Sequence, residues 1–244
     1  MQQIPNKEQC LKIFKRYVLF SSVEYHSVAT TSVAMWLANQ VKEKIPNINL
    51  DIVFATSLFH DLGKGLVIAK LEPEKYGFEP LNSEQFKTWQ LLRSFYQPLE
   101  NLYTDLKNIA PDFKKVVHET DVASLIIGAL FPDFLPYLHQ IGGTNNPIYL
   151  KAGPEIKIMH YADWRVHRFN IVDFKTRLKF LEEVYWKGSK DEWKKREAQE
   201  LALEKEIFAK LDITPELDLD AINKMKNQLF KEYDFQINRV TAID

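Results

Sequence analysis

The chain has 244 residues, of which 45% are hydrophobic and 27% are charged, and its formal net charge is -1. These values are typical of a soluble globular protein and exclude a disordered chain, a collagen-like repeat and a bundle of membrane helices. The balanced charge provides no global attraction to nucleic acid or to an anionic membrane.

The single cysteine, Cys10, excludes an internal disulfide and a cysteine-based zinc site. The polar N-terminal residues lack the apolar core of a signal peptide. The longest apolar stretch, 125–131, is much shorter than the roughly 20 residues that a membrane-spanning helix needs. We therefore expect a cytoplasmic protein with no membrane partner.

Apolar residues recur with helical spacing along almost the whole chain. In chain order, this spacing predicts helices over 11–18, 22–44, 52–60, 84–95, 112–130, 154–166, 171–185, 190–210 and 218–233. Asp51 is expected to cap the third helix, which is apolar on most sides and is therefore predicted to be central and buried. No segment with strand periodicity competes with these helices, so the predicted fold class is all-α.

The composition changes near residue 187, where a charge-dense segment begins. We expect residues 1–186 to form one domain and residues 187–244 to form a C-terminal helical extension packed on it. The charges between 187 and 205 are most simply a solvated helix face. The apolar residues among them could pack on a second copy of the chain, which allows a homodimer.

One adjacent pair of metal-capable side chains, His60-Asp61, ends the apolar helix predicted over 52–60. Gly63 follows shortly after and allows the chain to turn sharply around the pair. Upstream, His26 lies on the apolar stripe of its predicted helix, and downstream Asp163 lies in the helix predicted over 154–166. Buried ionisable side chains are costly unless they are paired or metal-bound, so the pattern favours a metal site.

Taken together, these residues resemble the HD-domain metal-dependent phosphohydrolase superfamily, whose pattern is a His, a later His-Asp pair and a distal Asp on core helices. The pair stands in the segment HDLGK at 60–64, and the distal Asp stands in YADWR at 161–165. The resemblance covers about residues 10–185 and implies an HD-domain helical bundle. It implies that the metal ligands are His26, His60, Asp61 and Asp163. Such a mixed nitrogen and oxygen site suits a divalent ion: Mn, Fe, Co, Ni, Zn or Mg.

The implied function is metal-dependent hydrolysis of a phosphomonoester or phosphodiester, a nucleotide or a similar small molecule. A bound divalent ion lowers the pKa of a water molecule and so provides a nucleophile near neutral pH. In this interpretation Asp61 also orients the attacking water, while Lys64 and Arg165 hold the phosphate. His118 is a further catalytic candidate, because some members of the superfamily carry extra histidines that bind a second metal or contact the phosphate.

Several of these residues also have simpler structural interpretations. A histidine on an apolar helix face, such as His26 or His118, is most often a hydrogen-bonded core residue. Lys64 could be a cation favoured by the helix dipole, and Arg165 could pair with a surface acid. His160 and His167 are expected to share a helical face, either as supports of the metal site or as interface residues.

Two alternative functions are also open. A di-iron oxygenase of the same superfamily would need a second set of ligands, which His118 and its neighbours supply only in part. A non-catalytic sensor module would keep the fold and bind a nucleotide without turnover. The expected partner is a small-molecule phosphate ester, and there is no strong signal for nucleic-acid binding.

Overall fold

The computed structural model describes residues 3–17, 21–64, 105, 108, 119–141, 147–211 and 216–233. These residues are helical apart from one short hairpin and the connecting loops, so the all-α prediction is confirmed. The helix predicted over 84–95 and the first part of the helix predicted over 112–130 lie outside the described residues.

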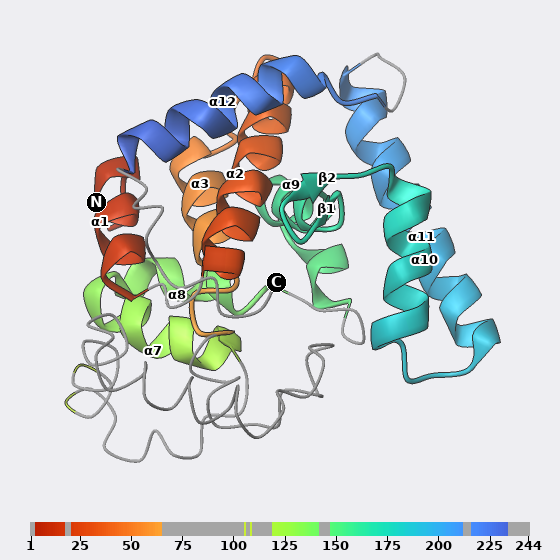
Figure 1. Cartoon of the computed structure of the whole chain (residues 1–244), viewed down its shortest axis with the longest axis horizontal. Helices are drawn as coiled ribbons and strands as arrows, with labels where there is room; N and C mark the ends of the chain where they lie inside the picture. Colours follow the sequence, from red (N-terminus) through yellow and green to blue (C-terminus); the bar gives the residue numbers. More distant parts are fainter. Residues whose placement is uncertain are drawn as a thin grey trace.

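Figure 1 shows the elements in chain order along the colour bar. The longer helices are α1 (Lys7–Tyr17), α2 (Ser21–Val41), α3 (Leu50–Phe59), α7 (Glu119–Leu130), α9 (Pro154–Asp163), α10 (Phe174–Tyr185), α11 (Lys190–Leu211) and α12 (Leu219–Glu232). The short ones are η3 (Pro132–Phe134), α8 (Leu135–Leu138) and η4 (Ile148–Lys151).

A two-stranded antiparallel hairpin separates α9 from α10. Its strands are β1 (Val166–His167) and β2 (Asn170–Ile171), with Val166 opposite Ile171. The sequence predicted helix on both sides of this point and no strand, so it missed the hairpin. The turn depends on Arg168, which has a φ of 58°, a left-handed conformation that helical spacing does not reveal.

Helices α2 and α3 form the centre of the described fold, and both pack against α9. In Figure 1, α1, α7 and α8 lie on one side of this pair and α9, α10 and α11 lie on the other, while α12 crosses above α2. Two hydrophobic clusters fill the spaces between these layers, one on each side of the central pair. Because α2, α3 and α9 pack on one another, the C-terminal ends of α3 and α9 both lie next to α2.

The prediction that α3 is central and buried is confirmed, since every residue from Ile52 to Phe59 is buried. Its hydroxyl groups do not disturb the core, because Thr56 and Ser57 donate hydrogen bonds to backbone carbonyls one turn earlier. The predicted cap was wrong. Asn49, not Asp51, caps the helix, and its side chain accepts hydrogen bonds from the backbone N–H groups of Asp51 and Ile52.

A buried polar network attaches α11 to α9. Glu200 on α11 accepts hydrogen bonds from the Tyr149 hydroxyl and from His160 Nε2 at 3.0 Å, and it forms an ion pair with Arg196 at 3.1 Å. The His160 ring also stacks on Tyr149, with ring centroids 3.4 Å apart. The charged segment is therefore not only a solvated face, because Arg196 and Glu200 are buried. The division of the chain at residue 186 stays a prediction.

Across the described ranges, no helix combines the length and the apolar character that crossing a membrane requires.

Candidate metal centre

Four side chains from three helices meet where α2, α3 and α9 pack together. His26 comes from α2, His60 and Asp61 follow the last residue of α3, and Asp163 is the last residue of α9. Potential ligand atoms of His26, His60 and Asp61 all lie within 4.8 Å of one another. Asp163 Oδ1 lies 2.9 Å from His26 Nε2 and 3.4 Å from His60 Nε2. The four residues that the sequence singled out as metal ligands are thus neighbours in the structure.

The local backbone explains how two of these side chains leave a buried helix end together. His60 is the C-terminal cap of α3, and its N–H still donates to Thr56 O. Turns then follow, with the N–H of Lys64 bonded to Asp61 O. The apolar residues of α3 anchor the helix in the core, so the His-Asp pair is held at a fixed depth.

Backbone carbonyls orient both imidazole rings. His26 Nδ1 lies 2.9 Å from Arg168 O, and His60 Nδ1 lies 2.8 Å from Ser57 O. Because a carbonyl can only accept, each Nδ1 carries the proton and donates it. Each Nε2 then faces the cluster, which is the arrangement that metal-binding histidines use.

Electrostatics keep both carboxylates ionised. Burial alone would raise the pKa of Asp61, but the charges of Lys64, His60 and His26 lower that pKa to about 2. The pKa of Asp163 lies well below its ordinary value, because its hydrogen bond to His26 and its close contact with His60 outweigh the effect of burial. Burial would lower the pKa of His60, whereas Asp61 and Asp163 raise it to about 9. Without a metal, a proton on His60 thus supplies the positive charge that the two carboxylates favour.

The donor set fits a divalent metal ion. His60 Nε2 is buried and has no hydrogen-bond partner of good geometry among the described residues, although it points at two carboxylates. A buried polar atom without a partner is costly, and a metal ion would satisfy it. Two imidazole nitrogens and two carboxylates suit a borderline first-row ion, with coordination positions left for water and substrate.

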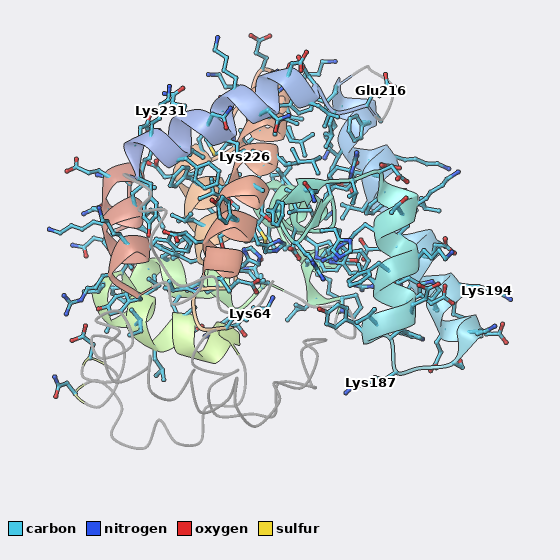
Figure 2. All side chains as sticks on the ribbon, in the orientation of Figure 1. Lys64, Lys187, Lys194, Glu216, Lys226 and Lys231 are labelled. Atoms are coloured by element: carbon cyan, nitrogen blue, oxygen red, sulfur yellow. The ribbon has the colours of Figure 1, made fainter. Side chains whose placement is uncertain are left out.

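The remaining predicted catalytic residues have different positions. Lys64 Nζ lies 2.7 Å from Asp61 Oδ2, at the edge of the cluster. Figure 2 labels Lys64 beyond the end of α3, inward of Lys187 and Lys194, which project from the periphery. Arg165 is buried and donates to the Tyr161 hydroxyl and to Val172 O. His118 lies outside the described residues.

The prediction that His160 and His167 share a helical face was wrong. Helix α9 ends at Asp163, so His167 lies on β1 instead. His160 points away from the metal ligands and binds Glu200 in the contact between α9 and α11. This placement matches the interface alternative for His160.

Two residues near the cluster, Arg168 and Arg177, were not predicted from the sequence. Arg168 provides the carbonyl that orients His26, and no side-chain pattern could have revealed this backbone role. Arg177 lies on the buried face of α10 beside Phe174, Leu178 and Leu181. A charged residue at an apolar position of a helical stripe was visible in the sequence and could have drawn attention to Arg177.

His167 lies in the same region and is partly buried. Burial lowers the pKa of His167, and the positive charges of Arg177, Arg168 and His26 lower it further. Positive charge therefore accumulates on this side of the cluster.

Comparison with known proteins identifies the domain that contains most of the cluster. The family model described as the HD domain matches residues 23–126. The matched range includes His26, His60 and Asp61, whereas Asp163 lies beyond its end and joins the cluster through the packing of α9. No curated protein and no solved structure matches the chain.

Proposed function

This chain carries an HD domain, the domain of the metal-dependent phosphohydrolase superfamily, and on that basis we propose that it is a metal-dependent phosphohydrolase. The proposed substrate is a phosphomonoester or phosphodiester, a nucleotide or a similar small molecule. One observation carries the proposal: the histidine pair and the two carboxylates converge, and the buried His60 Nε2 makes no hydrogen bond of good geometry among the described residues.

We assign the metal ligands as His26, His60, Asp61 and Asp163. When bound there, a divalent ion would lower the pKa of a water molecule and polarise a phosphoryl oxygen. The chain contributes orientation, since the Arg168 and Ser57 carbonyls hold the two rings with Nε2 toward the ion position.

Asp61 and Lys64 have further proposed roles. Asp61 is held ionised by its neighbours, so it can accept a hydrogen bond from the attacking water and orient it. Lys64 is partly exposed beside Asp61, and its ammonium group can hold a phosphate oxygen at the open edge of the cluster. These two residues would place the nucleophile and the substrate next to each other.

Elemental analysis of the purified protein tests the metal site. The variant is Asp61→Asn, which keeps the shape of the side chain and removes its charge. Its control is Asp51→Asn, the same change on an exposed residue in the first turn of α3. We expect about one first-row metal ion per chain in the wild type and in the control. Since changing residues that only support a ligand already costs 10–100-fold, we expect Asp61→Asn to weaken binding by about 100-fold or more.

Activity is then measured on a panel of phosphomonoesters and phosphodiesters with Mn, Ni, Co, Fe, Zn and Mg. Metal-dependent turnover that is lost in Asp61→Asn and retained in Asp51→Asn supports the proposal. A protein that takes up none of these ions after incubation would contradict the metal site. Stoichiometric metal without turnover on any ester would contradict the hydrolase and favour the sensor alternative.

A further inference from the structure

Arg177 is a buried cation whose side chain has no hydrogen-bond or ion-pair partner among the described residues. Its side chain lies on the apolar face of α10, and the residue is 9% exposed. Its Nε atom is buried without a hydrogen-bond partner among the described residues, and its guanidinium forms no ion pair with any of them. The guanidinium does contact an aromatic ring: its central carbon lies 5.3 Å from the centre of the Phe180 ring. Burying a charge in this way is unfavourable unless a counter-ion compensates it.

The other two buried arginines of the described chain both have partners. Arg196 lies 3.1 Å from Glu200 Oε1. Arg165 donates to Val172 O at 2.8 Å and to the Tyr161 hydroxyl at 2.6 Å. Arg177 thus stands apart from two arginines of similar burial, and the difference is the missing acceptor.

The guanidinium of Arg177 lies within electrostatic reach of the metal cluster. Burial lowers the pKa of Arg177, while the nearby acidic groups of Asp163, Tyr185 and Asp61 raise it. Both carboxylates nevertheless have other partners: Asp163 Oδ1 contacts His26 and His60, and Asp61 Oδ2 contacts Lys64. Neither forms an ion pair with Arg177, so a further anion can compensate its charge.

The hairpin connects Arg177 to the histidine ligands. His167 on β1 packs against Phe180, with ring centroids 4.1 Å apart, and Arg177 lies over the same Phe180 ring. Arg168, which follows His167 in the hairpin, provides the carbonyl that binds His26 Nδ1. The side of the cluster that faces α10 therefore carries Arg177 and the hairpin.

We propose that Arg177 binds the phosphate group of the substrate beside the metal site. The proposal rests on the proposed function in taking the anion to be a phosphate ester. A guanidinium offers several N–H donors in a planar fork that matches two phosphate oxygens. The sequence predicted an arginine of this region, Arg165, for that role. Two nitrogen atoms of Arg165 already donate to the protein, whereas Nε of Arg177 has no acceptor among the described residues.

Phosphate binding to two matched variants tests the proposal. Arg177→Met removes the charge and keeps an unbranched apolar chain. Lys175→Met makes the same change in charge at an exposed position of the same helix. The probe is inorganic phosphate, titrated by calorimetry into Mn-loaded and into chelator-treated protein. Because a charged hydrogen bond pair is lost, we expect Arg177→Met to weaken phosphate binding by about 10-fold or more. We expect Lys175→Met to change it by less than about 2-fold, since an exposed charge is screened.

Stability separates phosphate binding from a structural role. Because the Arg177 side chain makes no hydrogen bond with the described residues, Arg177→Met should leave the thermal midpoint of ligand-free protein unchanged or higher. Arg177→Lys keeps the positive charge but lacks the planar set of N–H donors, so it should bind phosphate with intermediate affinity. This variant replaces Arg177→Met in the test if the Met variant does not fold. Equal phosphate affinity in the wild type and both Arg177 variants would overturn the proposal. It would also be overturned if neither the Mn-loaded nor the chelator-treated wild type bound phosphate.

The failure of this proposal can be told from the failure of the proposed function. If no ester is hydrolysed but phosphate binding depends on Arg177, the anion site stands without the hydrolase. If esters are hydrolysed and Arg177→Met leaves KM and phosphate affinity unchanged, the hydrolase stands and Arg177 is not its phosphate-binding residue.

Discussion

Arg168 shows how a single backbone conformation supports the metal site. Its φ of 58° lies in the left-handed region, which a non-glycine residue adopts at a cost of about 1–2 kcal/mol. In this conformation the carbonyl oxygen accepts a hydrogen bond from His26 Nδ1, with the two atoms 2.9 Å apart. The strain is therefore located where the fold sets the direction of a proposed ligand.

Glycine at position 168 should relieve this strain without removing the carbonyl. We expect Arg168→Gly to raise the free energy of unfolding by up to about 1 kcal/mol, and Arg168→Val to lower it by at least as much, because a β-branched side chain is unfavourable at positive φ. Urea unfolding of metal-free protein measures both. We expect metal affinity in Arg168→Gly to match the wild type, since only the backbone atom contacts His26. A Gly variant less stable than the Val variant would contradict this interpretation.

At the scale of elements, the contact between α9 and α11 depends on one buried carboxylate. Glu200 accepts hydrogen bonds from Tyr149 and His160 and forms an ion pair with Arg196, so its removal would take this carboxylate partner from all three. Burial alone would raise the pKa of Glu200, but the charges and hydrogen bonds of these neighbours lower it below the ordinary 4.5. Glu200 is therefore ionised at neutral pH and binds α11 to the core.

Replacing Glu200 should be costly in a way that depends on pH. We expect Glu200→Gln to lower the free energy of unfolding at pH 7 by about 3 kcal/mol or more, because a buried ion pair loses one partner. The folded pKa is depressed, so the contribution of Glu200 is complete above pH 4.5 and is lost as the pH falls through the lower folded value. The difference between wild type and variant should thus shrink below pH 4.5.

The matched control is Glu197→Gln, one turn earlier on α11, where Glu197 is less buried. Urea unfolding at a series of pH values should show little effect of this change. An equal loss of stability in both variants, or a difference for Glu200 that grows toward acid, would contradict the assignment.

At the scale of the whole molecule, α11 and α12 contribute to the same hydrophobic core as α2 and α9. Trp193, Leu203, Phe208 and Ile222 are buried in the same cluster as residues of α2 and α9. Helix α12 also packs directly on α2, the helix that carries His26.

A chain ending at residue 186 should therefore fail to fold as a stable domain. This shortened chain lacks α11 and α12, so the apolar faces of α2, α9 and α10 that these helices cover would be exposed to water. We expect the full chain to unfold in one cooperative thermal transition and the shortened chain to lack such a transition. Circular dichroism in the near and far ultraviolet measures both. A shortened chain with a cooperative transition near the midpoint of the full chain would show instead that residues 1–186 are an independent domain.

The helical fold class, the central position of α3 and the residues of the candidate metal site could all be predicted from the amino-acid sequence. These features follow from short-range patterns: apolar spacing reports which helix faces are buried, and the His-Asp pair after an apolar helix stands out locally. The segment 154–166 was also recognised as a helix, although its last three residues leave α9 and enter the hairpin.

Only the tertiary structure decided which side chains meet. Asp163 reaches His26 across 137 residues of sequence because α9 packs on α2. The same packing turns His160 away from the cluster toward Glu200, and it leaves Arg177 buried near two carboxylates without contacting either. Such relations depend on how helices are placed in space, and the distances along the chain do not contain that information. The left-handed turn at Arg168 belongs to the same class, because its role is carried by a backbone carbonyl that every residue type possesses.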